Sequence, residues 1–197
     1  MQSSPPGKVP LLTLPNLLTL LRVVLVLPIA LLLLPSSDLA RWLAFALMVL
    51  ASLTDWADGY FARRNAQVSP LGRFLDPIAD KLLVVAVLVV LVATRDIRGW
   101  EVLAVVVILA REILISGLRE YMMEHGVTVH VTKLAKWKTT VQLIAVALFI
   151  LAPALPNPAD LVAGILLWLA ALLTLITGWD YLKGGLAHMA KPPDKSP

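Results

Sequence analysis

Four aspartates form two closely spaced pairs, Asp55 with Asp58 and Asp76 with Asp80. Because the members of a pair are three or four residues apart, each pair would lie on one face of a helix. Carboxylate oxygens without neighbouring histidine or cysteine favour hard ions such as Mg2+ or Mn2+. Four carboxylates suffice for two such ions, an arrangement that stabilises the attacking and leaving oxygens in phosphate chemistry. We therefore expect all four aspartates to be metal ligands.

The aspartates lie between apolar runs, in a chain that is 59% hydrophobic and 15% charged. Soluble domains are typically about one quarter charged, so this composition indicates an integral membrane protein. Since a span needs about 20 apolar residues, the sequence predicts an all-α protein with six transmembrane helices. The expected spans are Leu17 to Leu34, Leu39 to Phe61, Pro77 to Ala93, Trp100 to Tyr121, Leu134 to Leu151 and Leu161 to Leu182.

The basic residues predict the orientation of these spans. Only Arg41, Arg95 and Arg98 fall on one side, whereas the other side carries the larger set, Lys8, Arg63, Arg64, Arg73, Arg119, Lys133, Lys136, Lys138, Lys183, Lys191 and Lys195. By the positive-inside rule, both termini and the loop between the aspartate pairs are cytoplasmic. The net charge of +4 then requires no nucleic acid partner.

The expected domain organisation has a single membrane domain. It comprises an N-terminal juxtamembrane segment (1–13), a six-helix domain (14–186) and a disordered C-terminal tail (187–197). Both terminal stretches contain proline, serine and lysine, which suits segments without a packed core.

Small residues accompany the aspartates at Gly59, Ala62 and Gly72, and Arg63 follows one turn after Asp58. Small residues can admit a ligand, although they also allow close packing of membrane helices. Arg63 could bind a phosphate oxygen or serve only as a positive-inside residue.

These positions together resemble the signature of the CDP-alcohol phosphatidyltransferases. All eight defining positions match: Asp55, Asp58, Gly59, Ala62, Arg63, Gly72, Asp76 and Asp80. The resemblance implies that two Mg2+ or Mn2+ ions hold the pyrophosphate of CDP-diacylglycerol while an acceptor hydroxyl attacks and CMP leaves. It further implies that Asp80 is both a ligand and the catalytic general base. Residues implied to bind CDP-diacylglycerol are Asp58, Gly59, Ala62, Arg63 and Gly72, together with Asn16 and Thr19 of the first span.

Further segments resemble bacterial members of this family whose acceptor is glycerol 3-phosphate. They include Leu14 to Arg22, Phe74 to Lys81, Ala110 to Glu112, Ser116 to Glu120 and Lys136 to Thr140. The resemblance implies a homodimer in the bacterial inner membrane with a cytoplasmic active site. The candidates for binding the acceptor phosphate are Arg111, Arg119, Lys136 and Lys138. Arg111 stands inside an apolar run, where a charge needs a partner, and Glu112 could instead be that structural partner.

Other functions fit parts of the pattern. The acceptor could be inositol phosphate, serine or a phosphatidyl group, since the aspartate frame does not distinguish them. A secondary transporter can also hold charges within apolar helices, but we would expect repeated halves. Membrane prenyltransferases bind pyrophosphate lipids through paired aspartates too, but with a different first motif and more helices.

Overall fold

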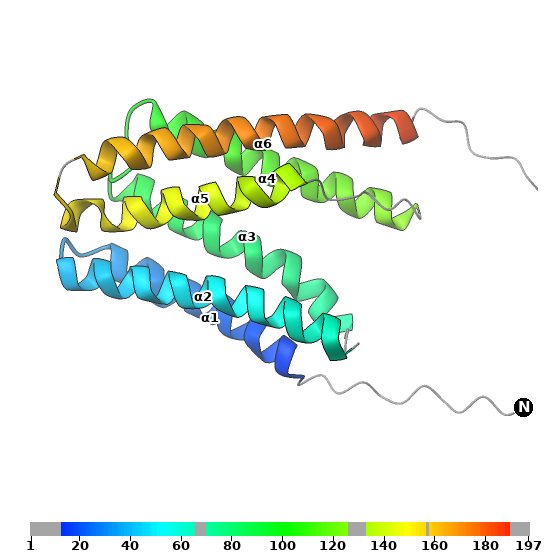
Figure 1. The fold of residues 1–197 in the computed structure, drawn as a ribbon, viewed down its shortest axis with the longest axis horizontal. Coiled ribbons are helices and arrows are strands. Elements are labelled where there is room, and N and C mark those ends of the chain that lie inside the picture. The colour runs from blue at the N-terminus through cyan, green and yellow to red at the C-terminus, as the bar shows by residue number, and fades with distance from the viewer. Residues whose placement is uncertain (1–12, 66–69, 126–132, 157, 190–197) are drawn as a thin grey trace, which may run out of the picture. The chain divides into compact units, whose positions relative to one another are not determined.

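The computed structural model describes residues 13–65, 70–125, 133–156 and 158–189. The described residues form six α-helices and one 3-10 turn, with no strand among them (Figure 1). Their bounds are α1 Leu14–Leu33, α2 Asp38–Asn65, α3 Pro70–Ala93, α4 Glu101–Glu124, α5 Lys133–Leu151, η1 Ala152–Ala154 and α6 Ala159–Met189. The expected all-α architecture is thereby confirmed, and each apolar run predicted as a span lies within or close to one helix.

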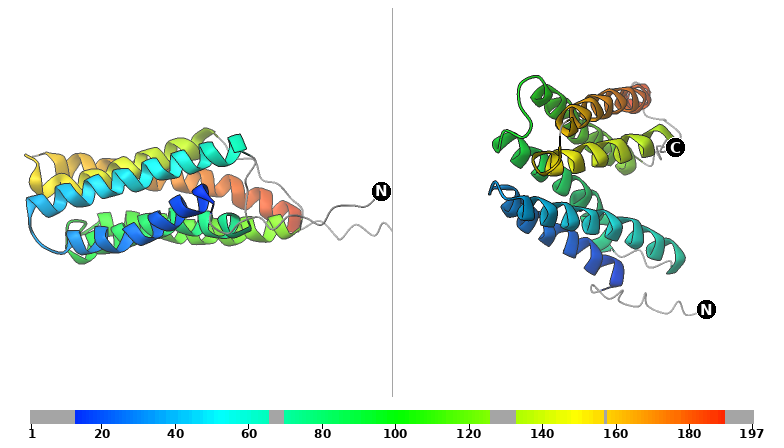
Figure 2. Two further views of the ribbon diagram at one scale, coloured as in Figure 1. Left: turned by 90° about the horizontal axis from the view of Figure 1, so that it is seen from below. Right: turned by 60° about the vertical axis from the view of Figure 1, so that its left-hand side comes forward.

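The chain divides into two compact units, 1–90 and 91–197. In the first unit, α1 and α2 lie side by side as a hairpin (Figures 1 and 2). The side chain of Thr13 caps α1 by accepting a hydrogen bond from the backbone N–H of Asn16, which satisfies one of the free amides at a helix start. The helix ends at Leu33, and Leu34 keeps an α conformation with its N–H bonded to the Leu31 carbonyl. The series of helical hydrogen bonds cannot continue through Pro35, which has no backbone N–H.

The third helix begins earlier than the sequence suggested. The third span was expected to begin at Pro77, but α3 starts at Pro70 and contains Pro77 in its interior. Pro70 suits a helix start because its missing N–H would have no intrahelical partner there. Membrane helices tolerate an internal proline such as Pro77. Asp76 and Asp80 therefore lie on one continuous helix.

The second unit contains α4, α5 and α6, and α6 packs against both of the other helices. The short turn η1 connects α5 to α6. The core of the second unit consists of apolar side chains that are almost fully buried, including Ile108 of α4, Phe149 of α5 and Leu167 of α6. At Gly164 a β-carbon would lie 2.6 Å from a carboxylate oxygen of Glu101, so a glycine allows α4 and α6 to approach closely here.

Within the described residues, three stretches in α1, α5 and α6 are long and apolar enough to cross a membrane, judged by length and composition: Asn16–Leu33, Trp137–Ala154 and Ala159–Leu186. The six-span count and the orientation of the termini remain predictions. The expected terminal segments fall largely on residues 1–12 and 190–197, which lie outside the described residues. α6 itself continues to Met189, three residues past the expected end of the six-helix domain at 186.

Candidate functional site

The first aspartate pair continues the buried face of α2. Ala44, Met48 and Ala51 are buried at successive spacings of four and three residues, the spacing that keeps positions on one side of a helix. Asp55 and Asp58 extend this series by four and then three residues. Their side chains lie outside the described part of the structure, but the helical backbone places both positions on the packing face of α2.

The second pair has the same relation to α3. Gly72 and Ala79 are buried. Asp76 lies four residues after Gly72 and three residues before Ala79. Asp80 stands seven residues, or two turns, before the buried Val87. Both aspartate positions therefore follow the packing face of their helix, although their side chains are likewise outside the description.

The two pairs also match in depth along their helices. Asp58 lies seven residues before the end of α2 and Asp76 lies six residues after the start of α3, whereas Asp55 and Asp80 are each ten residues from those ends. At a rise of 1.5 Å per residue, these positions are about 10 Å and about 15 Å from the connection. α2 ends at Asn65 and α3 begins at Pro70, so only four residues separate the two helices along the chain.

A buried polar face on α1 lies beside the first pair. Thr13, Asn16, Thr19 and Arg22 are between 1% and 7% exposed. Asn16 is 17 residues before the end of α1, and Asp55 is 17 residues after the start of α2. Because α1 and α2 form a hairpin, both positions are about 25 Å from the turn along their helices. The structure thus brings the Asn16 and Thr19 positions to the level of the aspartates.

The remaining residues of the expected CDP-diacylglycerol site follow the same arrangement. Gly59 and Ala62 continue the packing face of α2, with Arg63 at its edge, and Gly72 is buried on α3. Four carboxylates at matched depths would make an all-oxygen donor set, which would suit Mg2+ or Mn2+. The identity of the metal ligands stays a prediction, because the side chains of the four aspartates lie outside the described part of the structure.

In the second unit, Arg111 of α4 is held by two residues of α6 and by its own neighbour Glu112. Its Nε donates to the backbone carbonyl of Thr174 at 3.1 Å, and its Nη2 donates to Thr177 Oγ1 at 3.1 Å. Its third nitrogen, Nη1, lies 3.2 Å from Glu112 Oε1. These bonds satisfy the charge of an arginine that lies in the middle of α4, where an unpartnered cation would be costly in a membrane.

Glu112 links this arginine to α5. Its Oε1 accepts a hydrogen bond from Lys138 Nζ as well as from Arg111 Nη1. Two of the four basic residues expected at the acceptor phosphate are therefore brought together. Arg119 lies two turns further along α4 and is exposed, and the side chain of Lys136 is outside the description.

The sequence did not identify three residues of α6 that contact Arg111. Besides Thr174 and Thr177, Gly178 contacts Arg111: a β-carbon there would lie 3.0 Å from the Cγ of Arg111. The available signal was a pair of threonines three residues apart, followed by glycine, in an otherwise apolar run. Nothing local in that run indicated which helix the threonines would face.

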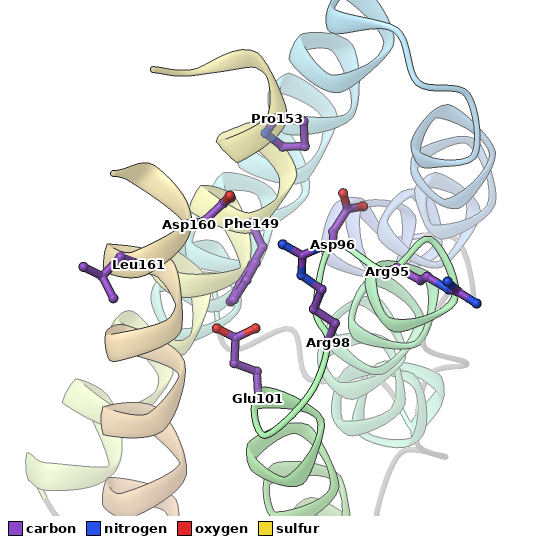
Figure 3. A pocket seen from close by; sticks show the side chains of 8 residues that line it. All are labelled: Arg95, Asp96, Arg98, Glu101, Phe149, Pro153, Asp160 and Leu161. Atoms are coloured by element: carbon purple, nitrogen blue, oxygen red, sulfur yellow. The ribbon is translucent and has the colours of Figure 1, made fainter. Parts of the chain in front are cut away.

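A polar recess of about 290 Å³ lies at the other end of this unit, where α4 and α6 begin. Figure 3 shows the Arg98 guanidinium and the carboxylates of Glu101 and Asp160 pointing into the recess, whereas Arg95 points away from it. Glu101 and Asp160 lie in the first turns of their helices, where the helix dipole favours a negative charge. The recess contains none of the residues predicted for catalysis or binding.

Comparison with known proteins agrees with the aspartate frame. Residues 12–176 match the family model for CDP-alcohol phosphatidyltransferase. This match covers most of the chain and includes all four aspartates, and the chain belongs to that family.

Curated relatives are similar to this chain over most of its length. Relatives from three organisms serve as examples, and each carries the name CDP-diacylglycerol–glycerol-3-phosphate 3-phosphatidyltransferase. The protein of Rickettsia bellii is 45% identical over 86% of this chain and 93% of its own length. That of Cereibacter sphaeroides is 36% identical over 90% and 97%, and that of Bacillus subtilis is 37% identical over 85% and 92%.

Proposed function

We propose that this protein transfers the phosphatidyl group of CDP-diacylglycerol to sn-glycerol 3-phosphate, which forms phosphatidylglycerophosphate and releases CMP. The observation that carries this proposal is the near full-length similarity to relatives of that name. The aspartate frame supports it, because its positions lie at matched depths on the packing faces of α2 and α3.

The chemistry assigns distinct tasks to the aspartates. Asp55, Asp58, Asp76 and Asp80 would hold two Mg2+ or Mn2+ ions. Such ions neutralise the charge that builds up on the pyrophosphate as CMP departs. The Asp80 carboxylate would also accept the proton of the attacking hydroxyl of glycerol 3-phosphate. That oxygen bonds to the phosphorus bearing the diacylglycerol, and the bond from this phosphorus to CMP breaks.

The donor side of the site would be completed by the residues around the aspartates. Gly59, Ala62 and Gly72 leave room for the nucleotide and its pyrophosphate, and Arg63 would bind a phosphate oxygen. Asn16 and Thr19 would contact the same substrate from the buried polar face of α1.

The acceptor phosphate would be bound by basic residues of the second unit. Arg111 uses three of its five N–H groups on Thr174, Thr177 and Glu112, so two remain for an anion. Lys138, whose Nζ donates to Glu112 Oε1, would be a second cation at this phosphate. Arg119 and Lys136 are the further candidates, and the exposed position of Arg119 suits the initial capture of the phosphate.

The same proposal includes the setting of the enzyme. Six spans with both termini in the cytoplasm would place the aspartates near the inner leaflet of a bacterial inner membrane, where glycerol 3-phosphate and CDP-diacylglycerol meet. The basic residues on the aspartate side support this orientation. We further propose that the enzyme is a homodimer.

The proposal is tested with purified protein in lipid nanodiscs that contain labelled CDP-diacylglycerol. Glycerol 3-phosphate, inositol phosphate and serine are supplied separately, and CMP release and lipid products are measured. We expect product only with glycerol 3-phosphate, complete loss of turnover with EDTA and recovery with excess Mg2+ or Mn2+. Transfer to inositol phosphate instead would refute the acceptor, and full activity in EDTA would refute the metal requirement.

A further inference from the structure

A groove of about 300 Å³ lies between α4 and α6 of the second unit. Its α4 wall runs from Val107 to Ile115, and its α6 wall runs from Leu175 to Leu182. At a rise of 1.5 Å per residue, these walls are about 12 Å and about 10 Å long. Ala110 and Gly178 keep the groove open, because neither residue has a side chain large enough to fill the space between the helices.

The groove offers an occupant mainly apolar contacts. Its lining residues Leu114, Leu175 and Trp179 are exposed. The one charged residue in the described lining is Arg111, which donates hydrogen bonds from three of its nitrogens within the cluster with α6 and Glu112. None of the described residues that line the groove is acidic, so nothing in this lining repels an anion.

The depth of the groove in a membrane follows from α6, whose Ala159–Leu186 stretch is long and apolar enough to cross one. Trp179 stands 20 residues after Ala159, which is about 30 Å of helix and equals the thickness of the hydrocarbon core. Tryptophan rings favour the boundary between hydrocarbon and headgroups. An exposed apolar groove beside this boundary is filled by an acyl chain, because the hydrocarbon core holds no water that could fill it.

Lys183 supplies a cation at the headgroup end of the groove. Its ammonium lies 5.4 Å from the centroid of the Trp179 ring, within the range of a cation–π interaction. Lys183 is exposed and follows Trp179 by one turn, about 6 Å further toward the headgroups. An ammonium has three N–H donors, which suit the oxygens of a phosphate. The carboxylate of Asp180 starts about 100° around the helix from Trp179, so the ring carries the cation rather than the anion.

We propose that the groove between α4 and α6 binds one acyl chain of an anionic phospholipid and that Lys183 binds the phosphate of its headgroup. A zwitterionic headgroup would bring a cation as well, for which the described lining offers no acidic partner. This site goes beyond the proposed function, and its test requires no turnover.

Two other occupants are less compatible with the groove. The substrate CDP-diacylglycerol is one, but the groove contains none of the residues predicted to bind it. A second copy of the chain is the other. It would cover Trp179 together with Lys183 and would withdraw the ammonium from water, at a desolvation cost.

The experiment uses the fluorescence of Trp179 in the full-length protein. Phospholipids with brominated acyl chains quench a tryptophan that they touch, so the protein is placed in phosphatidylcholine nanodiscs with increasing fractions of brominated phosphatidylglycerol or brominated phosphatidylethanolamine. The signal of Trp179 is the quenching that disappears in Trp179→Phe. We expect both lipids to quench it, with about fivefold stronger association of phosphatidylglycerol, the factor for one lysine near a membrane surface.

Two substitutions test the two ends of the site. Lys183→Gln should abolish the preference for phosphatidylglycerol, whereas Lys183→Arg keeps the charge and should retain the preference. Arg98→Gln is the matched control, because it removes the same charge just ahead of the start of α4, at the opposite end of that helix. Ala110→Leu fills the groove and should weaken quenching by both lipids. Its control is Ala46→Leu, an exposed alanine of α2 outside the groove.

Several results would overturn the site. Equal association of the two lipids with the wild-type protein, or a preference that survives in Lys183→Gln, would remove the role of the lysine. A Trp179 that neither lipid quenches would show that protein, such as a second copy, covers the groove. Displacement of brominated phosphatidylglycerol by CDP-diacylglycerol at a lower fraction than by unbrominated phosphatidylglycerol would assign the groove to the substrate. Because Lys183 is exposed, its substitution leaves the fold intact and keeps the test decisive.

Discussion

Gly178 of α6 is the position where the smallest substitution should have a measurable effect on the Arg111 cluster. In Gly178→Ala, the added β-carbon would lie 3.0 Å from Arg111 Cγ and 3.1 Å from its Nε. Comfortable carbon contacts are about 3.5 to 4.0 Å, so the arginine stem must retreat by about half an ångström. Nothing else in the substitution changes polarity or charge, which makes it a clean displacement of one side chain.

The size of the effect follows from the hydrogen bond of Arg111 that this displacement weakens. Arg111 Nε donates to the Thr174 carbonyl at 3.1 Å, and such a retreat brings the bond to the limit of useful geometry. A hydrogen bond from a charged group contributes about 1.5 to 3 kcal/mol. Replacing glycine in a helix returns up to about 1 kcal/mol. The expected net loss in the free energy of unfolding is about 0.5 to 2 kcal/mol.

Gly184 provides the matched control, because it is also in α6 and a β-carbon there would meet nothing within 4 Å. Gly184→Ala should gain up to about 1 kcal/mol from helix propensity alone. The difference between the two variants cancels the propensity contribution and should be about 1.5 to 3 kcal/mol. Unfolding in mixed micelles with increasing SDS, followed by tryptophan fluorescence, measures it directly.

The kinetic counterpart is measured on the same two proteins. We expect the KM for glycerol 3-phosphate to rise several-fold in Gly178→Ala and to stay unchanged in Gly184→Ala. Equal stability of the two variants would show that Arg111 is not confined as the structure describes. Equal KM values despite unequal stability would show that its position does not matter for the acceptor.

Two further substitutions test individual contacts. Asp80→Asn should reduce the rate of phosphatidyl transfer by 10²-fold or more, since a positioned general base contributes a rate factor of about 10² to 10⁴. The variant should still show a cooperative unfolding transition. Wild-type turnover in this variant would show that Asp80 is not the general base. Thr177→Val removes the hydroxyl that accepts from Arg111 Nη2 and should destabilise the protein by about 1 to 3 kcal/mol. The same SDS titration measures this loss. A stability within about 0.5 kcal/mol of wild type would mean that another contact replaces this hydrogen bond at no net cost.

Local sequence patterns predicted the helices well. The apolar runs fall on the helices observed, because a run that must satisfy its backbone internally in a membrane becomes a helix. The start of α3 was misjudged by seven residues because both Pro70 and Pro77 are compatible with a first turn, and only the structure shows that the helix passes through the second.

The candidate site was predicted unevenly for a physical reason. The register of Asp55 with Asp58 and of Asp76 with Asp80 depends only on helix periodicity, which sequence spacing reveals. The partners of Arg111 depend on tertiary packing: Thr174 and Thr177 are 63 and 66 residues away along the chain. Sequence spacing could name Glu112 as a partner, since it is adjacent, but could not find the α6 residues or the bond to Lys138.

The aspartates of α2 occupy the series of positions at which Ala44, Met48 and Ala51 pack. An alanine or leucine at those positions would suit a durable helix bundle better than a carboxylate, whereas the metal binding that we propose requires the carboxylates. A screen that scores only heat resistance or expression would therefore enrich apolar replacements at Asp55 and Asp58 and would deliver a robust protein that makes no lipid. Any campaign to stabilise this enzyme has to select for activity in the same step.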